Sequence, residues 1–201
     1  MSKAKPSANG PGAQLVSTRL RYQMGDANVR DRYLFTPKAD KGLKLQYELA
    51  DVAEGKLAFS EAALTSAAAF VVFNQGSPVV YVNGLPEKPP RTLAAHLPPF
   101  LLSRATLAAL KAGSQADLMP EWFDERDSLR LKARKQRKVK LDGASTSVPV
   151  LHCRGKNIEL WVVDDDVWPV ILERKEGEDG FYFWKFLEAG KKLKADEDEE
   201  F

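Results

Sequence analysis

Cysteine and histidine are scarce in this sequence, which has one cysteine and two histidines among 201 residues. A single cysteine excludes an internal disulfide bond and any multi-cysteine zinc or iron–sulfur site. His152 stands next to that cysteine, Cys153, but two adjacent residues leave only the remnant of a metal site. We therefore expect neither a metal nor a cofactor.

Long apolar runs are also missing. No stretch approaches the roughly 18–20 apolar residues that span a bilayer, and residues 1–14 lack the apolar segment of a secretory signal. We therefore expect a cytoplasmic location, with the periplasm as the alternative if a signal peptide has been removed.

The apolar content is nevertheless sufficient for a core, with 44% hydrophobic and 29% charged residues. One compact domain is the default at this length. The overall charge is +2, but five acids lie in the last six residues, so the rest of the chain carries +7. We predict a flexible N-terminus over residues 1–13, a single β-rich domain over 14–190 and a disordered acidic tail over 191–201.

Apolar and polar residues alternate over most of the chain, which is typical of half-buried strands. The alternation predicts strands over residues 15–23, 29–35 and 43–49, and residues 60–64 predict a short helical turn. Two more strands are predicted at 70–73 and 78–82, followed by a type I′ turn at Asn83-Gly84 and a proline-rich loop.

One helix is predicted near residues 103–112, because Ser103 is a suitable N-cap, Leu107 and Leu110 share a face and Gly113 follows the last turn. Beyond it, alternation and short turns predict strands over residues 129–133, 139–141, 148–153, 158–163, 170–173 and 181–187. Short connections favour antiparallel neighbours. The predicted fold class is α+β, with a predominantly antiparallel sheet.

A basic run between residues 130 and 140 contains seven cations and no acid. Its members are Arg130, Lys132, Arg134, Lys135, Arg137, Lys138 and Lys140. If the interleaved apolar residues face the core, the run forms a positive outer ribbon that suits phosphates or an acidic partner. The alternative is a solvated edge hairpin, in which cations discourage aggregation.

The acidic tail ends in an aromatic residue: Asp196, Glu197, Asp198, Glu199, Glu200 and Phe201. It resembles the tails of bacterial and phage single-stranded-DNA-binding proteins, which recruit partners and compete with DNA for a basic groove. The resemblance covers about six residues, and a solubilising tail is the alternative. Together with the basic run it makes single-stranded nucleic-acid binding the alternative function.

Catalytic and metal-binding patterns are incomplete. The segment from Asp142 to Thr146 resembles an aspartic-protease signature without its usual hydroxyl residue, and that mechanism needs a second carboxylate. Asp142-Gly143 equally predicts a hairpin turn. Neighbouring residues of a strand face opposite ways, so His152 is not placed to activate Cys153, although His96 is not excluded as its base. The acids at 164–166 lack a complete calcium-loop pattern and favour a turn.

Aromatic residues crowd the last third of the chain. Trp161, Trp168 and Trp184 belong either to the core or to the lining of a concavity that contacts a partner or an apolar ligand. We expect a core, and we take the three tryptophans as the candidate contact surface.

Three stretches carry a resemblance to a known family, namely residues 97–113, 139–151 and 158–172. In order and spacing they resemble bacterial half-barrel proteins of the lipoprotein-carrier type, in which a curved antiparallel sheet wraps a helix. The resemblance implies a fold and carries over no functional residue. We predict a non-enzymatic binding or assembly protein that holds a protein partner or an apolar ligand on its sheet or in its concavity.

Overall fold

A ten-stranded sheet dominates the fold, in the order β4-β3-β2-β1-β10-β9-β8-β7-β6-β5. The computed structural model describes residues 9–26, 30–39, 42–49, 53–65, 101–118, 127–177 and 182–194. The strands are β1 (Arg19–Gly25), β2 (Arg30–Ala39), β3 (Gly42–Leu49), β4 (Ala53–Ser60), β5 (Ala116–Leu118), β6 (Asp127–Leu141), β7 (Ala144–Arg154), β8 (Ile158–Val163), β9 (Ile171–Glu176) and β10 (Tyr182–Gly190). The described helices are α1 (Pro11–Val16), α2 (Glu61–Thr65) and α4 (Arg104–Lys111).

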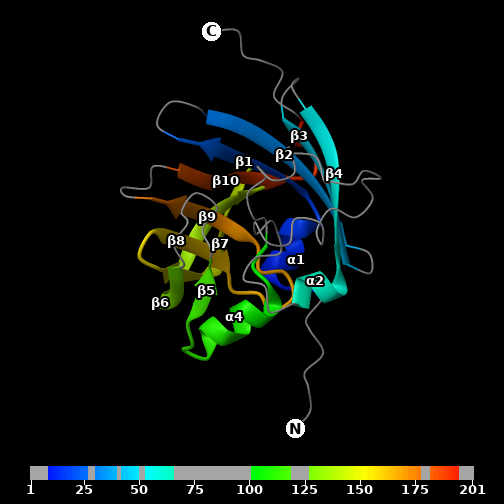
Figure 1. The fold of residues 1–201 in the computed structure, drawn as a ribbon. Helices are drawn as coiled ribbons and strands as arrows, with labels where there is room; N and C mark the ends of the chain where they lie inside the picture. The colour runs from blue at the N-terminus through cyan, green and yellow to red at the C-terminus, as the bar shows by residue number, and fades with distance from the viewer. Residues whose placement is uncertain are drawn as a thin grey trace, which may run out of the picture.

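The sheet is strongly curved. In Figure 1, β1–β4 and β6–β10 form two sides of the fold and α1 lies between them. Neighbouring strands pair in antiparallel fashion, but β6 also makes a short parallel pairing with β10, Lys140 opposite Glu188 and Leu141 opposite Ala189. The predicted fold class is therefore confirmed: an antiparallel, half-barrel-like α+β fold.

The aromatic part of the core lies on one face of this sheet, which we call the core face, and the buried Val148 and Val150 lie on the other face. Tyr22 of β1 stacks on Trp184 of β10, with ring centroids 4.4 Å apart, and its hydroxyl donates to the Ile171 carbonyl oxygen. Phe35 of β2 meets both rings edge-on. The core cluster also includes Leu15 of α1 and, from α4 and the residues before it, Leu101, Leu102, Leu107 and Leu110. These residues close the core face with apolar contacts.

A buried ion pair interrupts the apolar core face. Arg174 lies opposite Trp184 across the β9–β10 ladder and donates to Glu176, with side chains 4% and 0% exposed. The Oε2 atom of Glu176 and the indole Nε1 of Trp184 are buried with no hydrogen-bond partner among the residues described. Such a pair costs desolvation energy that its mutual attraction repays only with complete hydrogen bonding.

The N-terminal expectation is corrected by α1. Residues 15–16, predicted as strand, belong to this helix instead, and the helix begins at Pro11, within the segment predicted as a flexible N-terminus. Pro11 occupies its first turn, where a missing N–H costs nothing. Gly12 packs so closely on the Trp168 carbonyl that a Cβ would not fit. The helix is thus held by tertiary contacts.

The helix predicted at 103–112 is confirmed as α4. Ser103 caps it by accepting the Thr106 N–H at 3.2 Å, and Gly113 follows with φ +85°. The predicted strands before residue 50 are present as β1–β3. Those predicted after residue 129 are present as β6–β10, with 129–133 and 139–141 joined in β6, whereas β4 and β5 were not predicted. The strands predicted at 70–73 and 78–82, the turn at 83–84 and the proline-rich loop lie outside the described residues.

Candidate functional site

The three predicted tryptophans do not share one surface. Trp184 is fully buried in the core, and Trp168 is 9% exposed beneath the guanidinium of Arg104. Only Trp161 of β8 is partly exposed. It pairs across strands with Glu173, which in turn pairs with Lys185, next to Trp184 on β10. Trp161 therefore lies on the face of the sheet opposite to the core face.

Trp161 is the centre of a group that we call the aromatic–cation cluster: Lys135, Arg137, His152, Trp161 and Glu173. The His152 ring stacks on the indole at 4.1 Å between centroids, with 10° between planes. Lys135 Nζ and the Arg137 guanidinium carbon lie 5.4 and 5.2 Å from the ring centroid, within cation–π range. The cluster therefore presents a partly exposed aromatic ring in a fixed orientation, with positive charge beside it.

The carboxylate of Glu173 fixes the position of Arg137 in the cluster, although the two residues lie on strands that are not neighbours in the sheet. Arg137 on β6 donates to Glu173 on β9 at 2.5 Å, although β7 and β8 separate these strands in the sheet order. The contact requires the strong curvature described above. Burial alone would raise the pKa of Glu173, but the hydrogen bonds and charges of Arg137 and Lys175 outweigh it and lower the pKa below the ordinary 4.5.

This lowered pKa predicts a loss of stability in acid. A carboxylate whose pKa is lower in the folded protein contributes stability above its unfolded-state pKa, and that contribution is lost as the pH falls through the folded value. We expect the difference in unfolding free energy between the wild type and Glu173→Gln to be largest near neutral pH and to shrink below pH 4.5. Urea unfolding of both proteins over this pH range measures it. A difference that does not change with pH would contradict the assignment.

His152 is held from its other side by Glu159, with Nε2 and Oε1 2.8 Å apart. The same strand register that places His152 on the cluster face turns Cys153 to the core, where it pairs with Leu160 and is fully buried. Burial raises the pKa of the Cys153 thiol to about 12. The thiol therefore stays protonated and sheltered. His96, the other candidate base, lies outside the described residues.

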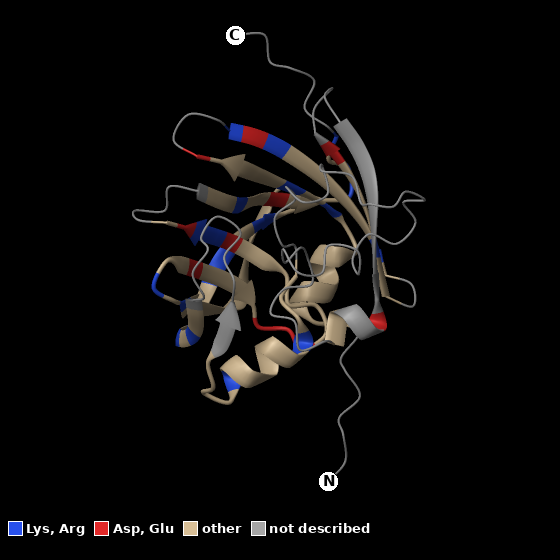
Figure 2. Cartoon of the chain, in the orientation of Figure 1, with Lys and Arg blue, Asp and Glu red and all other residues tan. Residues whose placement is uncertain are grey.

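The seven cations of the basic run lie on both faces of β6, not on one outer ribbon as predicted. Lys135 and Arg137 share the face of Val139, since they pair with Val150 and Val148, while Arg134 and Lys138 point to the other face. Three members form ion pairs, at 2.9, 2.5 and 2.9 Å: Arg134 with Asp164, Arg137 with Glu173 and Lys140 with Glu188. Arg130 donates to Gln115. Lys132 and Lys138 are exposed, and neither forms an ion pair with an acid of the described part of the chain. Figure 2 shows acidic and basic residues next to one another along β9.

The acidic turn at residues 164–166 is a structural clamp. Lys111 of α4 lies 2.6 Å from Asp164 and 2.8 Å from Asp166. Asp165 is buried and accepts backbone N–H groups from Gly12, Val167 and Trp168 at 2.9–3.0 Å. Asp164 and Asp166 thus share Lys111, whereas Asp165 binds backbone N–H groups. No group of three or more potential metal ligands occurs within the described ranges.

Asp142 forms the predicted hairpin turn between β6 and β7. Asp142 and Gly143 have φ angles of +47° and +82°, as a type I′ turn requires. The Asp142 side chain accepts the backbone N–H of Lys191 at 2.8 Å, and its own N–H donates to Ala189. The carboxylate is therefore committed to joining this turn to the end of β10.

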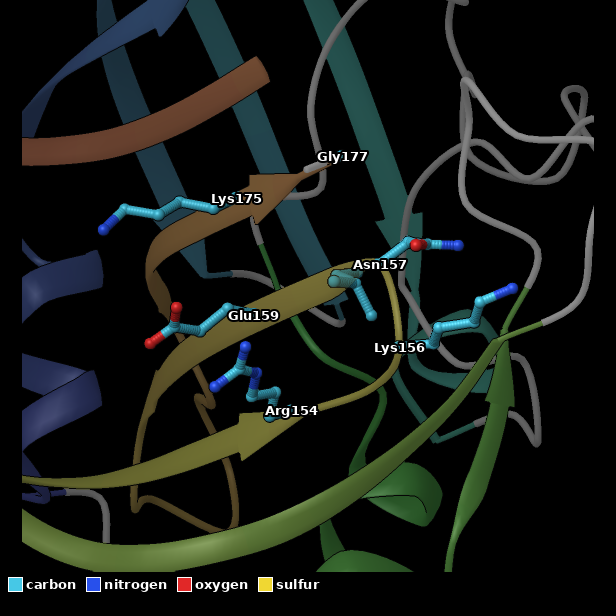
Figure 3. Close-up of a pocket in the computed structure, with 7 residues that line it drawn as sticks. Arg154, Lys156, Asn157, Glu159, Lys175 and Gly177 are labelled. Carbon is cyan, nitrogen blue, oxygen red and sulfur yellow. The ribbon is translucent and has the colours of Figure 1, made fainter. Parts of the chain in front are cut away.

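Charged or polar residues supply most of the lining of two hollows. One of about 270 Å³ adjoins the cluster and is lined by Arg134, Lys135, Gln136, Pro149, Val150 and Asp164. Another of about 220 Å³ lies at the β7–β8 turn (Figure 3). There Lys156 and Asn157 point away from Glu159 and Lys175, so its cations do not converge on one ligand position. The first hollow extends the cluster, and the second is a separate feature.

Comparison with known proteins finds similar solved structures, among them two that contain MucB. No protein-family model matches the sequence, and no curated protein matches it. A crystal structure of MucB in complex with MucA(peri) aligns over 92% of this chain and 55% of that chain, with TM-score 0.39 and 11% identity. The MucA/MucB complex of Pseudomonas aeruginosa aligns over 92% and 57%, with TM-score 0.40 and 11% identity. This chain thus spans little more than half the length of the chains it matches, and its resemblance to lipoprotein carriers stays a prediction. No helix in the described ranges has the length and apolar character needed to cross a bilayer.

Proposed function

We propose that this chain is a non-enzymatic binding protein that holds a protein partner on the aromatic–cation cluster. The observation that carries the proposal is Trp161, a large ring that is partly exposed yet held by the stacked His152 and flanked by Lys135 and Arg137. Tryptophan and arginine dominate the energetic centres of protein interfaces. A ring that is already oriented loses little entropy on binding.

The cluster indicates the chemistry of the partner. Lys135 lies over the indole, and the guanidinium of Arg137 lies beside it on the same face of β6. An acidic side chain of the partner would meet these cations, and an apolar side chain would cover the ring. The hollow of about 270 Å³ beside Lys135 offers room for such a side chain. We therefore infer a partner segment that combines acidic and apolar residues.

The ion pairs within the basic run favour a protein over a nucleic acid as the partner. Three carboxylates, Asp164, Glu173 and Glu188, already neutralise three cations of the basic run. Phosphate binding draws its affinity from releasing counterions around free cations, so each internal pair reduces it. An apolar ligand is disfavoured on the core face, because the side chains described there pack against α1 and α4. The cytoplasmic location and its periplasmic alternative stay predictions.

The test uses the full chain as bait to isolate its partner, followed by calorimetry with the purified partner. We expect Trp161→Ala to weaken binding about 30-fold, since a central anchor contributes roughly 2 kcal/mol. The matched control is Lys156→Ala, an exposed residue outside the cluster, which should bind as the wild type does. Circular dichroism verifies that both variants fold.

Equal affinity of folded Trp161→Ala and the wild type would overturn the proposed site. A parallel titration with a single-stranded oligonucleotide at low salt should give no binding. Binding that falls steeply as salt rises would instead establish the nucleic-acid alternative.

A further inference from the structure

A separate hollow of about 560 Å³ lies where β10 ends against the β6–β7 turn. Its cationic lining comes from Lys140, Lys191 and Lys192, and Leu193 adds an apolar side chain. Lys191 and Lys192 are exposed, and the side chain of Lys140 is 58% exposed despite its ion pair with Glu188. The hollow therefore combines available positive charge with a small apolar contact.

The two acids of the hollow are already engaged. Glu188 lies between Arg21 and Lys140 and forms an ion pair with each. Asp142 accepts the Lys191 backbone N–H at 2.8 Å. Their charge is thus compensated locally, so the ammonium groups of Lys191 and Lys192 determine how the hollow interacts with an incoming group.

The chain leaves the described fold at the edge of this hollow. Arg19 Nη1 donates to the Leu193 carbonyl oxygen at 2.5 Å, and Arg21 Nη2 donates to that of Lys194 at 2.8 Å. With the Asp142 contact, these bonds hold residues 191–194 against β1 and the β6–β7 turn. Residues 195–201, which lie outside the described residues, follow at once with five acids and Phe201.

We propose that this acidic segment of the same chain, residues 196–201, docks in the hollow. Its acids complement the lysines, and Phe201 provides an apolar side chain for Leu193. Seven residues span at most about 24 Å, so the segment remains close to the hollow. Covalent attachment through a short linker gives it an effective concentration in the millimolar range. A docked segment would shield this basic end of the sheet from other anionic molecules. This inference is independent of the proposed function, since the aromatic–cation cluster contributes no residue to it.

The test places a nitroxide label at the end of the full chain through a cysteine added after Phe201, since Cys153 is buried with its pKa raised to about 12. In ¹⁵N spectra at low salt, we expect most of the amide signal intensity of Gly143, Gly190 and Lys192 to be lost. About 1 M salt, where the Debye length is about 3 Å, should restore it. The triple replacement of Lys140, Lys191 and Lys192 by Gln should also restore it, whereas the control Lys156→Gln with Lys175→Gln should not.

A second sample mixes nitroxide-labelled protein without ¹⁵N and ¹⁵N protein without the nitroxide. The amide signals of the ¹⁵N protein should show no broadening in this mixture. Broadening in that sample would assign the hollow to a second copy and overturn the intramolecular proposal. Broadening on the aromatic–cation cluster instead, or none at the hollow at low salt, would also overturn it. None of these three results would bear on partner binding by Trp161, because that experiment has its own readout.

Discussion

Replacing Asp165 with alanine is expected to lower the free energy of unfolding by about 3–5 kcal/mol, because it leaves buried backbone donors unpaired. The carboxylate accepts the N–H groups of Gly12, Val167 and Trp168, and the side chain is buried where α1 meets the β8–β9 connection. One kcal/mol shifts the melting temperature of a chain of this size by roughly 2–4 °C. A loss of about 10 °C or more in calorimetry is therefore the expected result.

Two variants control this prediction. Asp165→Asn keeps one acceptor oxygen and should lose clearly less stability than Asp165→Ala. Asp166→Ala removes an acid from the same turn, but its side chain is 76% exposed and bonds only Lys111 among the contacts described. Exposed ion pairs contribute about 0–1 kcal/mol. If Asp165→Ala had the same melting temperature as Asp166→Ala, the Asp165 carboxylate would not be what joins α1 to this turn.

Breaking the buried pair of Arg174 and Glu176 should be as costly. Glu176→Gln removes the buried carboxylate charge that the Arg174 guanidinium, 4% exposed, contacts on the core face. The removal of one partner from a buried pair typically costs about 3–5 kcal/mol. Urea unfolding measures the loss, and the circular dichroism of the native protein verifies that the fold is retained.

Replacing both residues together separates the effect of the charges on stability from the effect of side-chain packing. Changing Arg174 to Met and Glu176 to Leu together removes both charges and the buried Glu176 oxygen that lacks a partner. We expect this double variant to lie within about 1 kcal/mol of the wild type or above it. Glu48→Gln, which breaks the half-exposed pair with Arg19, should cost about 1 kcal/mol or less. A double variant as unstable as Glu176→Gln alone would show that the side chains matter for shape and not for charge.

Part of the candidate site could be predicted from the sequence. Lys135 and Arg137 have the same parity as Val139, whereas Arg134 and Lys138 have the other, so the alternation itself divides the cations between the two faces of β6. Parity likewise places His152 and Cys153 on opposite faces, as the structure has them. Reading all seven cations as one surface overlooked this change of parity within the run.

Other contacts had no sequence signal. Asp165 bonds Gly12, which is 153 residues away, and nothing near the N-terminus marks α1 as the partner of that turn. Arg137 reaches Glu173 only because the sheet curls enough to bring β6 towards β9. Alternation identifies the two faces of a strand, but it does not say which face of a curved sheet will be covered.

The sequence by itself determined the local elements: strands from the two-residue alternation, α4 from Ser103 and Gly113, and the hairpin turn from Asp142-Gly143. These depend on backbone preferences and short-range hydrogen bonds, which neighbouring residues dictate. Only the tertiary structure decided that Trp184 is buried while Trp161 remains partly exposed. Burial depends on which elements, distant in sequence, pack on each face, and the curvature of the sheet controls that packing.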